Sequence, residues 1–291
     1  MNKQYNTTTA SQWLPTSKKE MKELGWQQAD IILFTGDAFV DHPSFGAAVI
    51  GRVLEAEGFK VAVVPQPNWQ DDLRDFKKLG VPGLFFAVTA GNMDSMVNHY
   101  TAGKRKRSDD AYTPGGRPGK RPDYATTVYS RILKQLYPEV PIIIGGIEAS
   151  LRRVTHYDYW SDRLMPSILV DTQADLLFYG MGEKSIIEFA RLLERGVPLE
   201  KITTIPQTAF LVNANQQYAT KKEWGTIELS SHEECMADKK KYARNFRFIE
   251  EESNKREASV LIQQVENKKV VINPPWPVFK EEELDRIYDL P

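Results

Sequence analysis

The chain has 291 residues, of which 41% are hydrophobic, and its formal net charge at pH 7 is −1. This length can hold one large α/β domain or two smaller ones. The near-neutral charge provides no global field that would select for nucleic acid or a membrane surface. The only cysteine, Cys235, excludes an internal disulfide and any metal site built from cysteines alone.

Residues 1–28 are predicted to form a polar arm with one short helix. Ser17 and Glu20 have the spacing of a capping box, and Gly25 would end the helix. The chain does not open on an apolar signal core, and no apolar run in it reaches the roughly 20 residues that span a bilayer. We therefore expect a cytoplasmic protein without a membrane segment.

Residues 29–212 alternate between short apolar runs and helical patterns. The runs predict buried strands at 31–34, 61–64, 84–88, 142–144 and 176–179. The helical patterns cover 44–57, 73–79, 124–137 and 184–195. This alternation predicts an α/β domain with a doubly wound, mainly parallel sheet, similar to flavodoxin-like and cobalamin-binding domains.

Two segments depart from the alternation. Residues 103–123 form a basic insertion rich in glycine and proline, which we expect to leave the sheet as a mobile loop. Its basic stretch, 104–121, could contact nucleic acid, although a run of charge is usually a solvated loop. Residues 213–291 predict a mixed α+β extension, with a charged helix at 233–256, a strand at 270–272 and a proline-rich linker at 273–277.

Glycine follows several of the predicted strands. In a flavodoxin-like strand order, ligands bind at the carboxyl edge between the first and third strands, and glycine lets a ligand approach the backbone. We therefore predict that the loops after the strands converge into one crevice, although glycine also serves simple tight turns. The candidates for substrate or cofactor binding in these loops are Gly36, Asp37, Gly91, Asn92, Gly145 and Gly146. Gly145 and Gly146 are expected to need positive φ or to leave space for the ligand.

Four charged or titratable candidates lie in the same loops. Asp41 and His42 could bind a metal or a cobalt corrin, or could cap the helix that follows. The sequence Asp-His-Pro-Ser-Phe-Gly matches the Asp-x-His-x-x-Gly pattern of cobalamin-binding domains only in part. Glu148 and Arg152 are four residues apart and could pair on a helix, or the arginine could bind a carboxylate or phosphate. The aromatic run 156–160 could stack on a flat ligand or contact another domain, but packing within this chain is the interpretation that we favour.

Four segments together resemble the N-terminal region of the YgiQ-type radical S-adenosylmethionine proteins. They are Gly-Asp-Ala-Phe-Val-Asp-His-Pro-Ser-Phe-Gly at 36–46, Tyr-Thr-Pro-Gly-Gly at 112–116, Gly-Gly-Ile-Glu-Ala-Ser-Leu-Arg-Arg at 145–153 and His-Tyr-Asp-Tyr-Trp at 156–160. The resemblance implies an enzyme whose next domain is a barrel with a Cys-x3-Cys-x2-Cys motif, a 4Fe-4S cluster and S-adenosylmethionine. Because that motif is absent here, we expect a piece that stops before the barrel, with no cofactor, metal or catalytic residue of its own.

Three functions are therefore open. The chain could be the accessory domain of a radical S-adenosylmethionine enzyme, with its own C-terminal barrel as partner and a substrate of unknown class. It could instead be a small-ligand or cobalamin-binding module without catalysis. It could also contact nucleic acid through residues 104–121.

Overall fold

The computed structural model describes residues 13–291, so the first part of the predicted arm, residues 1–12, lies outside the described residues. Helix α1 (Lys18–Glu23) has the predicted capping box. The amide of Ser17 donates to Glu20 Oε2 at 2.9 Å, and the amide of Glu20 donates to Ser17 Oγ at 3.3 Å. These bonds satisfy backbone donors that the first turn of a helix leaves without partners.

Within residues 13–291 the strands form a nine-stranded main sheet, ordered β2-β1-β3-β4-β7-β8-β11-β10-β9, and a separate pair, β5-β6. The first five strands of the main sheet are parallel and are β1 (Ile31–Thr35), β2 (Val61–Pro65), β3 (Phe85–Thr89), β4 (Ile142–Gly145) and β7 (Leu176–Phe178). Their order is the flavodoxin-like one, with the reversal between β1 and β3. The predicted fold class is therefore confirmed.

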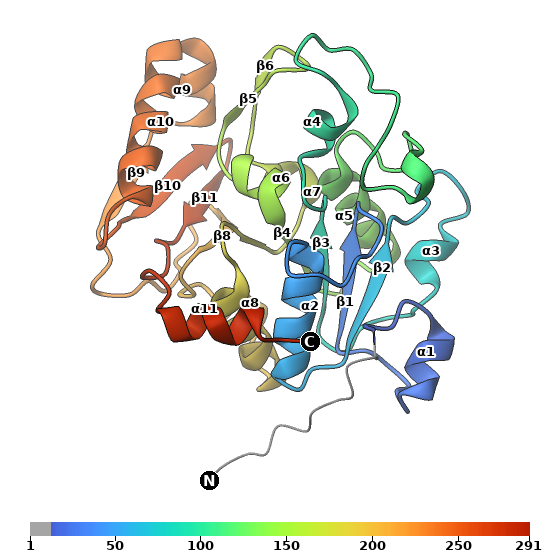
Figure 1. Cartoon of the computed structure of the whole chain (residues 1–291). Coiled ribbons are helices and arrows are strands. Elements are labelled where there is room, and N and C mark those ends of the chain that lie inside the picture. The colour runs from blue at the N-terminus through green and yellow to red at the C-terminus, as the bar shows by residue number, and fades with distance from the viewer. Residues whose placement is uncertain (1–12) are drawn as a thin grey trace.

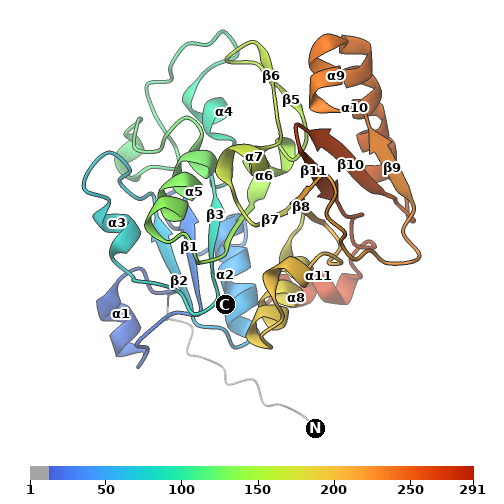
Figure 2. The ribbon, with the colours of Figure 1, turned by 180° about the vertical axis from the view of Figure 1, so that it is seen from behind.

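Helices cover both faces of this parallel part (Figures 1 and 2). One face carries α2 (Gly46–Ala56) and α8 (Glu183–Glu194), and the other carries α3 (Arg74–Lys77), α5 (Ala125–Leu136) and α7 (Ile168–Thr172). Alternate residues of β1 enter two separate cores, Ile31 and Leu33 on the α2 side, Ile32 and Phe34 on the other. Burial on both faces explains why these strands are continuous apolar runs.

The C-terminal extension continues the main sheet. It is joined through β8 (Thr208–Asn213), which lies at the end of the predicted α/β domain and pairs antiparallel with β7. The strands of the extension are β9 (Thr226–Leu229), β10 (Val260–Val265) and β11 (Lys268–Ile272). Two helices, α9 (His232–Ala237) and α10 (Lys239–Ser253), replace the single helix expected there. The break falls at Asp238, whose backbone is extended and whose side chain caps α10 by accepting from the amide of Lys240.

Several short elements were not predicted. Besides α7, β8, β9 and β10, they are α4 (Ser95–His99), η1 (Pro114–Gly116), α6 (Gly146–Leu151), β5 (His156–Asp158), β6 (Arg163–Met165), η2 (Leu199–Lys201) and α11 (Glu281–Tyr288). Of these, α4, η1, α6, β5 and β6 follow β3 or β4 along the chain, at the carboxyl edge of the sheet. Helix α11 lies in front of the α2–α8 layer in Figure 1. Within residues 13–291, no helix is both long and apolar enough to cross a membrane.

Candidate functional site

A cavity of about 390 Å³ opens at the carboxyl edge of the sheet, between α2 and α8. It lies where the strand order reverses, which is the usual ligand position in open α/β sheets. Helix α11 contributes part of its wall. The apolar lining residues include Val49, Ile50, Val88, Ile143, Ile144, Phe178, Ile186, Leu284 and Ile287.

The polar groups of the cavity are few. Within the described residues that line it, Glu183 carries the only charged side chain, and no lysine or arginine faces it. Burial raises the pKa of Glu183 above its ordinary value. Its Oε2 atom is buried without a hydrogen-bond partner in the described residues. The lining therefore suits an apolar molecule that offers one donor or positive charge, and does not suit a phosphate or carboxylate.

Three of the predicted glycines, Gly91, Gly145 and Gly146, line this cavity. Gly146 has a φ of +81°, and a Cβ there would overlap Thr89 Oγ1, so glycine is required. Gly145 has a φ of −161°, which is extended backbone, and its Cβ would meet its nearest atom at 3.5 Å. Of the two alternatives for Gly145, the structure therefore agrees with the second: the residue does not need positive φ, and its small size leaves room in the cavity.

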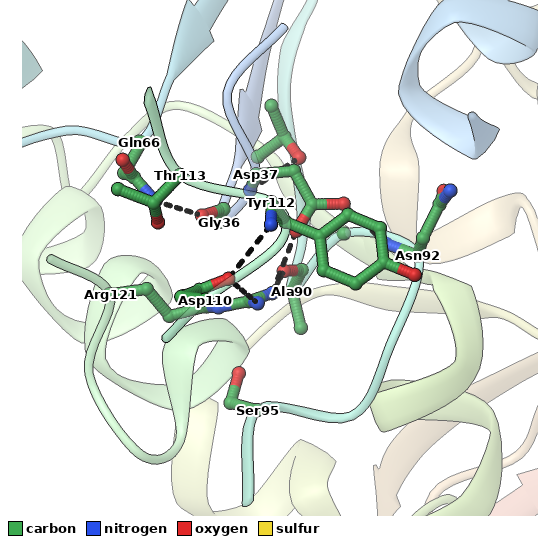
Figure 3. A network of polar contacts seen from close by, with 12 residues as sticks. Gly36, Asp37, Gln66, Ala90, Asn92, Ser95, Asp110, Tyr112, Thr113 and Arg121 are labelled. Atoms are coloured by element: carbon green, nitrogen blue, oxygen red, sulfur yellow. Dashed lines mark hydrogen bonds and ion pairs between the residues drawn. The ribbon is translucent and has the colours of Figure 1, made fainter. Parts of the chain in front are cut away.

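Asp37 lies in a buried network behind the rim (Figure 3). Its carboxylate accepts from the amide of Asn92 at 2.6 Å and from Arg121 Nη1 at 2.8 Å. Arg121 Nη1 also donates to the carbonyl of Ala90 at 2.7 Å, and its Nη2 lies 3.7 Å from Asp110 Oδ1. One arginine thereby ties the basic insertion to the ends of β1 and β3.

Burial dominates the titration of Asp37. Burial raises the pKa of the carboxyl to about 6, although the hydrogen bond from the Asn92 amide and the charge of Arg121 both lower it. The predicted glycines Gly36 and Gly91 make room for the network. A Cβ on Gly91, whose φ is +107°, would overlap the Asp37 carboxylate, and one on Gly36 would overlap the carbonyl of Ala90. These glycines serve close packing of the loops.

Asp41 and His42 do not cap α2. The residue before the helix is Phe45, which provides no side-chain hydrogen bond, and the amide of Gly46 donates instead to Asn92 Oδ1 at 3.2 Å. Asp41 forms an ion pair with Arg52 in the middle of α2. His42 is exposed, and its Nδ1 accepts from the amide of Ser44 at 3.1 Å.

Glu148 is 1% exposed and joins two helix starts. Its Oε2 accepts from the amide of Ser95 at 3.1 Å, and its Oε1 accepts from the amide of Thr126 at 2.9 Å. A carboxylate at helix N-termini is favoured by both hydrogen bonding and the helix dipole. Arg152 forms its ion pair with Asp94, and reaches only the main-chain oxygen of Glu148. The pair between the two side chains, which was one of the alternatives, is therefore not formed.

The predicted residues thus meet at one edge of the sheet, but in different settings. Three glycines line the cavity, while Asp37, Asn92, Glu148 and Arg152 hold the loops behind it. Sequence reasoning missed Arg121, Asp94, Glu183 and the α11 residues. Only Asp94 had a local signal, because it stands before α4 as a cap and accepts from the amides of Met96 and Val97.

The described residues do not fit an iron–sulfur cluster. Within residues 13–291, no group of three or more histidine, cysteine or acidic side chains is placed to hold a metal ion. Cys235 is buried on α9, where Asn245 Nδ2 donates to its sulfur at 3.2 Å. Burial raises the pKa of the thiol to about 11, which disfavours the thiolate that metals bind.

Comparison with known proteins places these features in a family. A family model described as radical SAM N-terminal matches residues 13–291. A UPF0313 protein of Bacteroides thetaiotaomicron is 61% identical over 99% of this chain and 47% of the relative. A UPF0313 protein of Thermotoga maritima is 49% identical over 96% of this chain and 48% of the relative. The chain spans about half the length of these curated relatives.

Among solved structures, the radical S-adenosylmethionine methyltransferase TsrM from Kitasatospora setae, with cobalamin and a [4Fe-4S] cluster bound, matches with a TM-score of 0.41. The match has 17% identity and covers 63% of this chain and 27% of that chain. The family model covers nearly the whole chain, and the curated relatives agree with it along the same residues. The chain therefore belongs to the radical SAM N-terminal family.

Proposed function

We propose that this chain is the N-terminal accessory domain of a radical S-adenosylmethionine iron–sulfur enzyme, and that its carboxyl-edge cavity binds the apolar part of a substrate or cofactor. Family membership supports the first part, and the greater length of the relatives is consistent with a C-terminal catalytic partner. The enzyme would work in the reducing cytoplasm, where an unpaired Cys235 and an iron–sulfur cluster are both stable.

The cavity is the observation that carries the second part. Its volume of about 390 Å³ falls within the roughly 300–1,000 Å³ range of small-molecule sites. It is mainly apolar, with the Glu183 carboxyl as one buried polar group. Apolar lining provides the affinity, and a single polar group fixes the orientation of the ligand.

The chain's own residues limit which cofactor they could hold. A 4Fe-4S cluster finds no ligand set among the described residues, so we assign the cluster to the partner domain, together with the S-adenosylmethionine that such a cluster would cleave. The role left for this chain is to bind and orient a molecule and to exclude water from it.

A cobalamin-binding module is the second candidate, favoured by the position of His42. This imidazole is exposed beside the cavity-lining residues Pro43 and Ser44. Its Nδ1 is engaged with the Ser44 amide, which leaves Nε2 as the possible cobalt ligand. Incubation with hydroxocobalamin followed by gel filtration distinguishes the candidates: co-eluting corrin absorbance that a His42→Ala variant loses would support the second one.

The cavity is tested by titration with the neutral apolar dye Nile red. Val49→Trp fills the cavity from α2 and should weaken dye binding at least tenfold. Val81→Trp is the matched control, because Val81 is 42% exposed and lies outside the lining. Equal dye binding by both variants would reject the cavity as the site.

The enzymatic part is tested on the full-length Bacteroides relative. After anaerobic reconstitution with iron and sulfide, it should bind a cluster and form 5′-deoxyadenosine from S-adenosylmethionine under reduction, and the 291-residue chain should do neither. A stoichiometric cluster in this chain, or none in the relative, would contradict the assignment.

A further inference from the structure

The basic insertion gathers its positive charges on one exposed surface. Residues 101–105 form the tip of a small hairpin, which a β-bridge between Tyr100 and Lys106 closes. Residues 117–120 lie beside this hairpin, because Lys106 Nζ is 4.0 Å from the position of a Cβ on Gly119. The exposed cations are Lys104, Arg105, Lys106, Arg107, Arg117 and Lys120. Within residues 13–291, none of these six cations forms an ion pair.

Aromatic rings of the β5–β6 hairpin lie next to these cations. Tyr157 and Tyr159 are each 48% exposed, and Asp158 between them points inward, where it accepts from Tyr124 at 2.9 Å. Tyr157 lies in β5 and Tyr159 follows it in the turn to β6, so both exposed rings belong to one hairpin. Trp160 packs against Tyr159 and Tyr100, with ring centroids 5.3 and 5.2 Å apart.

Direct contacts join the two parts into one surface, the basic–aromatic face, which lies at the top of the molecule in Figure 1. Lys104 Nζ donates to the carbonyl of Trp160 at 3.2 Å and lies 4.8 Å from the ring centroid of Tyr159. The Tyr159 hydroxyl donates to the carbonyl of Ala102 at 2.7 Å. The basic loop and the aromatic hairpin are thus held side by side.

The insertion is anchored, unlike an ordinary solvated charged loop. The buried Arg121 ties its end to Asp37. At its base, Asp123 accepts from the Tyr100 hydroxyl at 2.9 Å and contacts His99 Nδ1 at 2.8 Å. Fixed charges and rings lose less conformational entropy on binding than a mobile loop does.

We propose that the basic–aromatic face binds single-stranded nucleic acid. Clustered lysines and arginines neutralise phosphates, and exposed tyrosine rings stack on unpaired bases. An acidic peptide would use the cations but not the rings, and the bases of a duplex are not accessible for stacking. Of the exposed acids nearby, Asp109 lies in the loop and Asp162 accepts from the Tyr157 hydroxyl, so positive charge predominates.

The face follows β3 and β4 and therefore lies at the same sheet edge as the cavity. The proposal does not depend on a ligand in that cavity, because it uses different residues. The test is fluorescence anisotropy of labelled U12 and dT12 with the 291-residue chain, titrated from 50 to 200 mM KCl. The two oligonucleotides distinguish RNA from DNA as the source of the strand.

Both charge and stacking variants have defined effects. The pair Lys106→Ala and Arg107→Ala removes two phosphate contacts and should lower the salt slope by about 1.4, at roughly 0.7 per contact. Tyr159→Ala should weaken binding about tenfold without changing the slope, and Tyr159→Phe should restore it. The control pair, Lys18→Ala and Lys22→Ala, lies on exposed positions of α1 and should change neither quantity.

Several results would overturn the proposal. No binding of either oligonucleotide at 50 mM KCl would do so. Equal affinity for poly-L-glutamate, with no effect of Tyr159→Ala, would assign the face to an acidic protein. Equal affinity for a 12-base-pair duplex would show that stacking of the tyrosine rings on unpaired bases does not contribute to binding.

Discussion

The most informative perturbation of this domain is Arg121→Met. Arg121 is the largest fully buried side chain in the described part of the molecule. The substitution keeps an unbranched, flexible side chain of similar length but removes the guanidinium, which donates to Asp37 at 2.8 Å and to the Ala90 carbonyl at 2.7 Å. Asp37 and Asp110 would then face each other in the interior without a cation.

The expected loss in the free energy of unfolding is about 3–5 kcal/mol, the usual cost of removing one partner from a buried ion pair. This is a large part of the roughly 5–15 kcal/mol that stabilises a typical domain. Asp37→Asn in the same chain removes one of the two stranded charges. The double variant should therefore be less destabilised than the sum of the single variants, by about 1–3 kcal/mol.

Urea denaturation at pH 7.5, followed by circular dichroism, measures these differences. Arg117→Met is the matched control, because Arg117 lies in the same insertion, is exposed and has no ion pair within the described residues. It should change stability by less than about 0.5 kcal/mol. A loss below about 1 kcal/mol for Arg121→Met, or strict additivity with Asp37→Asn, would refute the role of Arg121 as the anchor of the insertion.

Three further predictions concern the carboxyl edge and the insertion. Gly146→Ala should lower the free energy of unfolding by about 2–3 kcal/mol in the same urea assay, because the φ of Gly146 is +81° and a Cβ there would overlap Thr89 Oγ1. Gly145→Ala, at a φ of −161°, should lower it by less than about 1 kcal/mol. Similar losses for the two variants would contradict the backbone geometry. The pKa of Asp37 is about 6 in the folded chain, while the unfolded carboxyl loses its proton near pH 4, so its contribution to stability should fall by about 2 kcal/mol as pH rises from 4 to 6. Asp37→Asn should abolish that fall. If the unsubstituted chain and the Asp37→Asn variant showed the same dependence of stability on pH, Asp37 would not be its cause. Limited trypsin digestion should cut first within residues 104–107, which are exposed loop residues, and later after Arg131 in helix α5; mass spectrometry of the first fragments decides.

The parallel half of the fold was predictable from sequence because its strands are buried on both faces and therefore appear as continuous apolar runs. The C-terminal strands were harder for a physical reason. In β10, the buried Gln263 interrupts the apolar pattern, and it is satisfied by distant groups: Thr155 donates its amide to Gln263 Oε1, and Gln263 Nε2 donates to the Ser230 carbonyl. Nothing local in the sequence specifies those partners.

The position of the candidate site in the fold was predictable from the sequence, but the residues that form it were predictable only in part. Topology alone brings the loops after parallel strands to one edge, so the convergence of Asp37, Gly91 and Gly146 follows from the strand order. The burial of Arg121 does not follow, because a charge in a basic loop is expected in water, and its partner Asp37 is 84 residues away. The contribution of α11 to the cavity wall depends equally on tertiary packing.

The central claim is that the cavity between α2 and α8 is a ligand site, and isoleucine-methyl NMR tests it most directly. Titration of the 13C-methyl-labelled chain with Nile red should shift the signals of the lining residues Ile50, Ile143, Ile186 and Ile287. Ile31, buried near the opposite end of β1 and outside the lining, should not shift. Saturable shifts confined to the lining would agree with the proposed site. Shifts that spare the lining, or none at stoichiometric dye, would contradict it.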